Sequence, residues 1–454
     1  MFTGLVAILA LSPLPFASNR PWSWSLLSMI VGLLMLVWAV AAWRDNQLVA
    51  VSVRRIWPIL LMFAMIVCWF VVQASPWTPE SWHHPAWAAT ATALDTPIGG
   101  AVSIDPAMTL TALMRLLSYG GVFWLALQFG RNEAYAGKIL WAIVITGFLY
   151  SVYGMIIEFG NFNTVLWYER WAYNDSLTST FINRNSFATY AGLSLLAAMG
   201  LTFNEFRRDA AGGLMTLSGF RWILEQITGR LGVLLLMTST IGSALLLTGS
   251  RGGMAAFTLG LFVLSAGFIL SPGSRPTVGI IITALCALFV AGVMALSGEL
   301  VLARFASATN DAVGRTVFYR AVFDAILADP WIGAGYGTFE VSFPMVRDAT
   351  ITTPLLLDKA HNSYLEFAYE AGVPAFALMM GLLGGLVALC VHGIWKRREH
   401  RLYPCIGTAA AALVASHALI DFSIQIPAVA VLFAALLGVA SAQSLREHDP
   451  SSDL

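Results

Sequence analysis

The chain has 454 residues, of which 58 % are hydrophobic and 11 % are charged, whereas soluble domains carry about 25 % charged residues. A water-soluble fold could not cover this much apolar surface, so the composition excludes that class and indicates a polytopic membrane protein. The formal net charge is zero, which offers no field that attracts nucleic acid, and we expect no nucleic-acid partner.

Apolar runs long enough to cross a bilayer recur along the whole chain. A helix needs about 20 apolar residues to span the hydrocarbon layer, and these runs lack the alternation of a β-barrel. We therefore predict an all-α fold with about twelve transmembrane helices, forming one membrane domain over residues 1–454. The expected spans are 1–17, 22–43, 56–74, 109–129, 138–158, 185–203, 231–249, 252–270, 277–298, 373–395, 404–421 and 427–444. The first is expected to be retained, because no basic residues precede it as in a signal peptide.

Basic residues in the short loops predict the orientation. Arg44, Arg131, Arg207 and Lys396 each follow an even-numbered span, whereas the loop 75–108 after the third span contains neither Lys nor Arg. Cytoplasmic loops carry the excess of Lys and Arg. Both termini are therefore expected in the cytoplasm.

This orientation places the long segment 299–372, between the ninth and tenth spans, on the outer face, where no ATP is available. Residues 314–330 predict an amphipathic helix that ends at Asp329-Pro330, with Arg320 and Asp324 as an i,i+4 pair. Its apolar stripe consists of Phe318, Val322, Ala325 and Ile326. The glycine-rich stretch WIGAGYGTF (331–339) predicts tight turns, and without a Walker sequence it is only a weak indication of phosphate binding.

His361 lies in this outer segment, in KAHNSYLEFAYEAGVP. Ser363 and Glu366 match a capping box, which predicts a helix that starts at Ser363. A histidine before that start could act as a general base, or it could only cap the helix or bond a neighbouring carbonyl, and the residues alone leave both alternatives open. Four residues are possible supporting groups: Asn362, Tyr364, Glu366 and Arg320.

Three arginines are candidates for holding an anionic group. Arg251, in SRGG, interrupts an apolar run, and its two glycines would let a ligand approach; snorkelling to the interface is the alternative. Arg315 opens the amphipathic helix and could equally be an ordinary solvated charge. Arg184 lies between two asparagines in FINRNSFA (181–188), where helix capping is the alternative.

The remaining polar residues near span ends narrow the options. His417 and Asp421 are spaced i,i+4, and we expect a structural pair that braces helices, with a proton relay as the alternative. The span interiors hold almost no acidic residues, whereas a proton-coupled transporter needs such residues to carry protons. The chain has neither H-E-x-x-H nor D-x-D, and we expect no metal and no other cofactor.

Taken together, these motifs resemble the O-antigen ligase and O-antigen polymerase superfamily of bacterial membrane glycosyltransferases. The resemblance rests on SRGG (250–253), GR (314–315), DPWIGAGYGTF (329–339), AHNSYLEFAYEAG (360–372), DFSIQIP (421–427) and FINRNSFA (181–188). It covers roughly residues 180–445, while the first 180 residues match only as hydrophobic spans.

The resemblance implies a metal-independent, inverting transfer of a glycan from a polyprenyl diphosphate, usually undecaprenyl diphosphate, on the periplasmic side of the inner membrane. His361 would deprotonate the acceptor hydroxyl, while Arg251 and Arg315, with Arg184 as an addition, would hold the diphosphate. The resemblance also implies that the active site is partly carried by the amphipathic helices of 299–372.

The acceptor stays open at this point. A glycan or lipid A-core acceptor would make the protein a polymerase or ligase of lipopolysaccharide or exopolysaccharide biosynthesis, and relatives that glycosylate proteins use Ser or Thr. The alternative from another class is a transporter or flippase of lipid-linked glycans. It would use the same arginines to grip the diphosphate and would need no general base.

Overall fold

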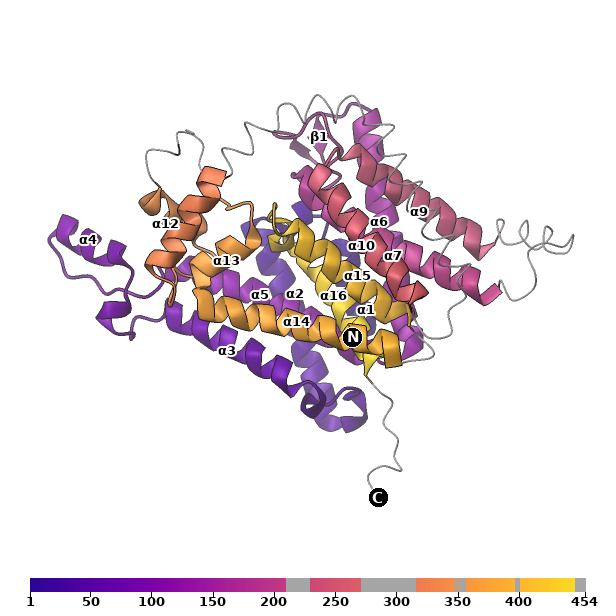
Figure 1. The fold of residues 1–454 in the computed structure, drawn as a ribbon, viewed down its shortest axis with the longest axis horizontal. Coiled ribbons are helices and arrows are strands. Elements are labelled where there is room, and N and C mark those ends of the chain that lie inside the picture. The colour runs from indigo at the N-terminus through magenta and orange to yellow at the C-terminus, as the bar shows by residue number, and fades with distance from the viewer. Residues whose placement is uncertain (210–228, 271–315, 348–350, 352–356, 397–400, 446–454) are drawn as a thin grey trace, which may run out of the picture.

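A computed structural model describes residues 1–209, 229–270, 316–347, 351, 357–396 and 401–445. Within these ranges the chain is helical apart from one antiparallel hairpin (Figure 1). The longer elements are α1 (Phe2–Leu11), α2 (Pro21–Arg44), α3 (Trp57–Ala74), α4 (Pro85–Leu94), α5 (Pro106–Phe129), α6 (Glu133–Phe159), β1 (Thr164–Val165), β2 (Tyr168–Glu169), α7 (Arg184–Asp209), α9 (Arg230–Leu247), α10 (Arg251–Ile269), α12 (Phe339–Val346), α13 (Ser363–Ala371), α14 (Val373–Lys396), α15 (Leu402–His417) and α16 (Pro427–Ser444). Short 3-10 helices lie at Phe16–Ser18, Asn46–Leu48, Val53–Arg55, Glu80–Trp82 and Ser423–Gln425.

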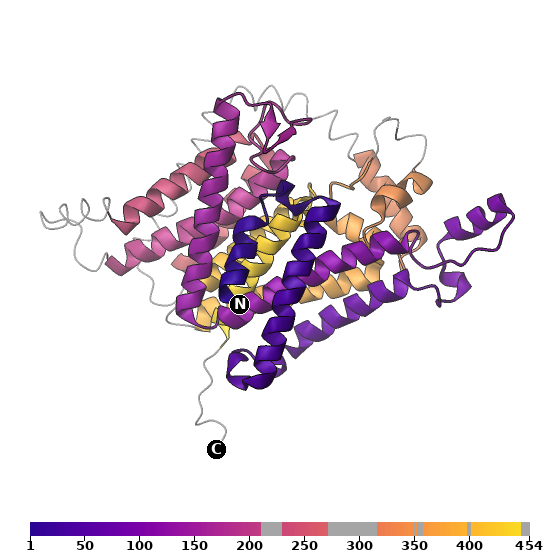
Figure 2. The same ribbon diagram turned by 180° about the vertical axis from the view of Figure 1, so that it is seen from behind.

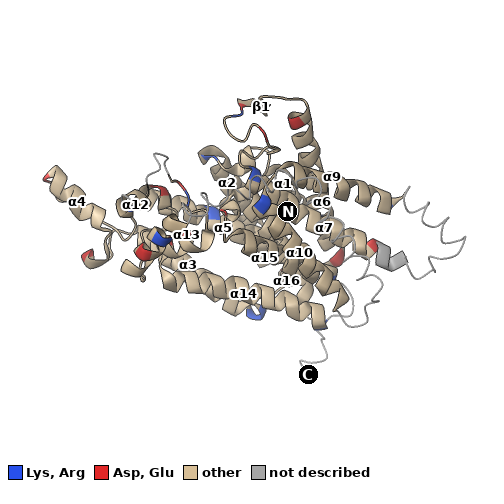
Figure 3. Cartoon of the chain, turned by 45° about the horizontal axis from the view of Figure 1, so that its top comes forward, with Lys and Arg blue, Asp and Glu red and all other residues tan. Residues whose placement is uncertain are grey.

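Among the described residues, nine helices are long and apolar enough to cross a membrane. Figure 3 shows few charged residues along these long helices. The shorter apolar helices α1 and α15 correspond to the first and eleventh expected spans, and the expected span 277–298 lies outside the described residues. The predicted fold class, an all-α polytopic membrane protein, is confirmed.

The first expected span, 1–17, is wrong in its extent. The helix ends at Leu11 because Pro13 follows, and proline has no N–H for the helical ladder and clashes with the preceding turn. The carbonyl oxygen of Pro13 accepts a hydrogen bond from Thr180 Oγ1 at 2.7 Å. A side chain from another segment therefore replaces part of the hydrogen bonding that the helix loses where it stops.

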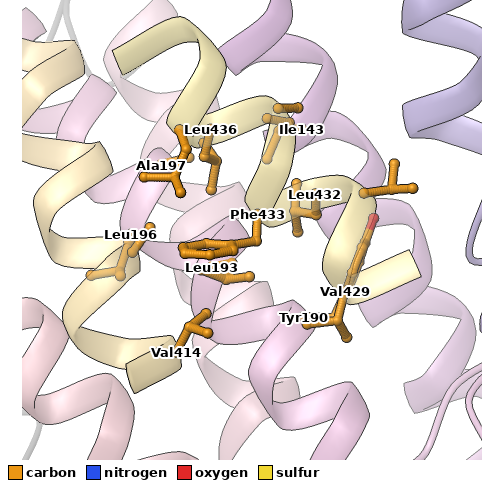
Figure 4. Close-up of a cluster of buried hydrophobic side chains, with 14 of the residues drawn as sticks. Ile143, Tyr190, Leu193, Leu196, Ala197, Val414, Val429, Leu432, Phe433 and Leu436 are labelled. Atoms are coloured by element: carbon orange, nitrogen blue, oxygen red, sulfur yellow. The ribbon is translucent and has the colours of Figure 1, made fainter. Parts of the chain in front are cut away.

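The centre of the bundle is formed by α7 and α16. In their most apolar stretches 94 % and 100 % of the residues are buried, against 22 % in α2 and in α14. Figure 4 shows side chains of α6, α7, α15 and α16 meeting in this core: Ile143, Tyr190, Leu193, Leu196, Ala197, Val414, Val429, Leu432, Phe433 and Leu436. Gly438 lets α16 approach α5, because an added Cβ would lie 2.6 Å from the carbonyl oxygen of Phe123. Small residues at such crossings are typical of membrane helices.

The N-terminal helices pack around this centre. α5 packs on α16, and α3 runs along α14 (Figure 1). Seen from behind, α1 and α2 lie across the opposite face of the bundle (Figure 2). The part of the chain without recognisable motifs therefore supports the part that carries them.

The described part of the outer segment has a hydrophobic core of its own. Residues 316–328 are helical, as predicted, and they pack with α12 and α13. The core consists of Phe318, Val322, Ile326, Ala334, Phe339, Phe343, Ile351, Ala360, Ala368 and Tyr369. Because the apolar stripe of 316–328 is used in this way, its polar face, with Arg320 and Asp324, is left to solvent.

The predicted orientation can be tested by labelling single cysteines. Glu80 and Asn46 are both exposed, and they lie in loops that are expected on opposite sides. In spheroplasts, a membrane-impermeant maleimide should modify Glu80→Cys directly and Asn46→Cys only after the membrane is permeabilised. The background carries Cys68→Ser, because Cys68 is exposed. The reverse labelling pattern would contradict the predicted orientation and show that the two loops lie on the opposite sides.

Candidate functional site

A chain of hydrogen bonds joins four segments that are far apart in the sequence. Ser250 Oγ donates to Asn185 Oδ1 at 2.8 Å, and Asn185 Nδ2 donates to Asp421 Oδ2 at 2.8 Å. The carbonyl oxygen of Asp421 accepts from Ser363 Oγ at 3.1 Å. We call these four residues the junction network. It connects four of the motifs noted in the sequence: 181–188, 250–253, 360–372 and 421–427.

Asp421 is the most constrained member of the junction network. Its side chain is 1 % exposed, and a buried carboxylate is costly unless its oxygens accept hydrogen bonds. Asn185 donates to Oδ2, and Ser423 Oγ donates to Oδ1. His417 does not hydrogen-bond to it; its Nδ1 lies 2.6 Å from Thr189 Oγ1. The expected direct His417–Asp421 pair is therefore wrong, and each residue braces α7 through a partner of its own.

Two of the three candidate arginines adjoin the junction network. Arg184 is the first residue of α7, directly before Asn185, and Arg251 is the first residue of α10, directly after Ser250. A Cβ added to Gly249 would lie 3.9 Å from Arg184 Nη1, so Arg184 lies beside the turn that leads to Arg251. The side chain of Arg251 is exposed.

Arg184 also has contacts within the protein. Its guanidinium lies 5.4 Å from the centre of the Tyr173 ring, and Nη1 donates to Ser176 Oγ at 3.2 Å. Its Nε is buried and has no hydrogen-bond partner among the described residues. Arg315 lies outside the described residues.

The two glycines after Arg251 have a packing role. A Cβ on Gly252 would lie 2.7 Å from Ile420 Cδ1, and one on Gly253 would lie 2.6 Å from Ala188 Cβ. Their small size lets α10 approach α7 and the turn after α15. Close helix packing thus accounts for both glycines, and the expectation that they also let a ligand approach Arg251 stays a prediction.

His361 adopts a backbone conformation that is unusual for a residue with a side chain. Its φ is 52°, in the left-handed region that costs a non-glycine residue about 1–2 kcal/mol. Tyr319 Oη donates to its carbonyl oxygen at 2.9 Å, and its ring lies 5.2 Å from that of Phe422. Among the described residues, none hydrogen-bonds to the imidazole. Strain of this kind clusters at functional sites.

The helix after His361 starts at Ser363, as predicted, but the predicted capping box is wrong. Asn362 is the cap, and its Oδ1 accepts from the backbone N–H groups of Tyr364 and Leu365 at 3.1 Å. Ser363 is instead held in the junction network. The asparagine next to the histidine therefore determines where α13 begins.

Glu366 holds the backbone of the residues directly before His361. Its carboxylate accepts from the backbone N–H of Ala360 at 2.8 Å and from Lys359 Nζ at 3.2 Å. Burial lowers the pKa of Lys359, but Glu366 and Glu370 more than offset this, so that the pKa is raised. Burial, with the nearby charge of Glu366, raises the pKa of Glu370 to about 7. Glu366 thus holds the backbone next to His361, while the Glu370 carboxylate accepts from the backbone N–H of Phe339 at 2.8 Å.

The other two supporting candidates behave differently from each other. Tyr364 Oη donates to the carbonyl oxygen of Ala415 at 2.8 Å and so ties α13 to α15. Arg320 and Asp324 form the predicted pair at 3.8 Å, but their side chains are 82 % and 64 % exposed. Arg320 is therefore a solvated surface charge that is not part of the junction network.

Gln73, near the end of α3, anchors the glycine-rich stretch and was not singled out in the sequence. Its Nε2 donates to the carbonyl oxygens of Ile332 (2.7 Å) and Glu370 (3.0 Å), and its Oε1 accepts from Tyr336 N (3.2 Å). Gly333 has φ +69°, and an added Cβ would collide with the Glu370 backbone. The glycines thus let this stretch fold tightly onto α13. A lone glutamine in an apolar span was the available signal.

The described residues contain no cluster of side chains that could bind a metal ion. Among these residues, no three side chains of His, Cys, Asp or Glu lie together as metal ligands would. The question of a metal requirement is addressed by the assay proposed below.

Replacing Asp421 with Asn should destabilise the protein by about 1–3 kcal/mol, because an amide cannot accept hydrogen bonds on both sides and leaves a buried donor unpaired. Unfolding in detergent measures this. Asp324→Asn makes the same chemical change at an exposed pair and should cost about 0.5 kcal/mol or less. Equal effects of the two substitutions would contradict the role of the junction network.

Gln73→Leu should loosen the glycine-rich stretch, because it leaves the Ile332 carbonyl and the Tyr336 N–H unpaired and removes one of the two hydrogen bonds to the Glu370 carbonyl. Hydrogen–deuterium exchange should become faster in 332–341 and in α13. Gln128→Leu is the matched control, since Gln128 is also buried and bonds both the N–H (3.0 Å) and the carbonyl oxygen (2.9 Å) of Val51. That variant should leave exchange in 332–341 unchanged; accelerated exchange in both would indicate general destabilisation.

Comparison with known proteins points to a family. No curated protein matches the chain. Residues 233–380 match the family model described as O-antigen ligase, Wzy_C. The matched stretch includes Arg251, Arg315 and His361, and it excludes Arg184 and Asp421. This match over about a third of the chain supports the O-antigen ligase superfamily and, with it, a membrane glycosyltransferase-like function in O-antigen processing.

Proposed function

We propose that the protein transfers a glycan from a polyprenyl diphosphate, such as undecaprenyl diphosphate, to an acceptor hydroxyl on the periplasmic side of a bacterial inner membrane. The acceptor would be lipid A-core, which makes the protein a ligase, or a glycan repeat unit that receives the growing chain, which makes it a polymerase. The observation that carries the proposal is the junction network, because it gathers the segments of Arg184, Arg251 and His361 at one end of the bundle.

In the proposed reaction His361 accepts the proton of the acceptor hydroxyl. The acceptor oxygen forms a bond to the anomeric carbon from the face opposite the diphosphate, which inverts the configuration. The bond between that carbon and the diphosphate oxygen breaks, and polyprenyl diphosphate leaves with the electron pair. Arg251, Arg315 and Arg184 would stabilise the charge on the leaving group by bidentate hydrogen bonds.

Two features of His361 support its role as the base. Its imidazole has no hydrogen-bond partner among the described residues, and its backbone is fixed from several sides by Tyr319 Oη, by the Asn362 cap and by the Glu366 bond to Ala360. A general base must be held in one place while its nitrogen stays accessible. This combination is costly for a residue whose only role is structural.

The assay uses purified protein in nanodiscs with undecaprenyl-diphosphate-linked glycan and candidate acceptors, and it follows release of undecaprenyl diphosphate together with new glycosidic product. His361→Gln should lower turnover by about 10²-fold or more, in the range for a general base. His392→Gln, at an exposed position of α14, should turn over normally. Unchanged turnover in wild type with EDTA would support a metal-independent reaction.

Normal turnover by a folded His361→Gln protein would refute the proposed base. Product that never forms, with glycan-lipid moved between leaflets by wild type and by His361→Gln alike, would favour the alternative of a flippase. The acceptor that becomes glycosylated distinguishes lipid A-core ligase, polymerase and protein O-glycosylation.

A further inference from the structure

Arg115 is a charged residue in the N-terminal half of an apolar span. It lies nine residues after Pro106, the first residue of α5, which corresponds to about 14 Å along the helix axis. Charged residues at such depth are expensive, face other polar groups and often mark ligand pathways. Neither the family match nor the sequence motifs include this position.

The protein satisfies the charge of Arg115 incompletely. The guanidinium lies 4.9 Å from the centre of the Trp24 ring. This cation–π contact involves the face of the guanidinium and does not use its N–H groups. A guanidinium also has five N–H donors in its plane. No described residue accepts a hydrogen bond from Arg115 or forms an ion pair with it, and its side chain is partly exposed.

A second polar group without a partner lies one turn further along α5. The hydroxyl of Tyr119 is buried and has no hydrogen-bond partner among the described residues. Residues four apart in a helix share a face, so Tyr119 and Arg115 lie on the same side of α5. An orphaned hydroxyl below an unpaired guanidinium is a cost that a ligand with several acceptor oxygens would offset.

Arg115 is directed toward the outer face. Side chains on a helix tilt toward its N-terminus, which for α5 is the end next to the outer segment. Its positive charge acts on groups in that segment: burial raises the pKa of Tyr336, and the charge of Arg115 opposes this rise. Burial and Arg115 both lower the pKa of Lys359, against the effect of the glutamates. Trp24, which contacts the guanidinium, is the fourth residue of α2, so the guanidinium lies toward the end of the bundle that carries this segment.

We propose that Arg115, with Trp24 beside it, forms a binding site for the phosphate of a lipid in the outer leaflet. Phosphate is the ligand that fits, because it presents several acceptor oxygens to the planar fork of a guanidinium and carries the opposite charge. A polyprenyl diphosphate and an anionic phospholipid both offer this group. The site goes beyond the proposed transfer reaction and does not depend on it.

Lipid titrations of the full-length protein, read by native mass spectrometry, test the proposal. The probes are undecaprenyl diphosphate, phosphatidylglycerol and, without phosphate, diacylglycerol. Arg115→Gln should weaken binding of at least one phosphorylated lipid about tenfold, the effect of losing charge-assisted hydrogen bonds, and should leave diacylglycerol unaffected. Arg115→Lys keeps the charge and should bind with intermediate affinity, provided that it melts as wild type does.

Arg20→Gln is the matched control. Arg20 also lies over an indole, that of Trp171, at 5.1 Å, but it precedes α2 and is outside the span. This variant should bind all three lipids as wild type does. Selective loss of undecaprenyl diphosphate or of phosphatidylglycerol in Arg115→Gln would identify which lipid occupies the site. Unchanged binding of both, or an equal loss of diacylglycerol, would overturn the proposal, whatever the result of the transfer assay.

Discussion

A buried carboxylate must be hydrogen-bonded on each oxygen, and the rest of the site depends on how Asp421 meets that requirement. Its partner Asn185 sits in the first turn of α7, the helix at the centre of the bundle, and accepts in turn from Ser250. Because an amide has one oxygen and one NH₂ group, Asn185 can serve both neighbours only in one orientation. The starts of α7 and α10 and the turn before α16 are therefore fixed relative to one another.

His361 is placed by this arrangement and by the outer segment together. Ser363 attaches the start of α13 to Asp421, while Tyr319 reaches the carbonyl oxygen of His361 from the helix 316–328. The left-handed backbone at His361 is tolerated because these contacts over-determine it. An imidazole whose backbone is held in one place, and to which no described residue hydrogen-bonds, is suited to receive a proton from a bound hydroxyl.

The N-terminal helices contribute more than hydrophobic bulk. Gln73 uses its amide to hold two carbonyls and one N–H of the outer segment, and Trp69 Nε1 donates to the carbonyl oxygen of Ala371 at 2.8 Å. α3 thus holds α13 through these hydrogen bonds, while Arg115 of α5 lies toward the same outer segment. Polar residues are scarce in these spans, and in a medium without water each of them has to find a partner in the protein or in a lipid.

The membrane class, the all-α fold and most of the spans could be predicted from the amino-acid sequence, because long apolar runs leave the backbone no other way to satisfy its hydrogen bonds in lipid. The sequence also indicated the start of α13 and the amphipathic helix before it, since both signals are local. Which polar residues contact one another became visible only in the packed bundle. The capping role of Asn362, the separation of His417 from Asp421 and the anchoring by Gln73 all depend on partners more than 50 residues away or on competition between neighbours for one hydrogen bond. Local patterns carry no information on such pairings, because a buried polar group takes whichever partner the packed helices bring to it.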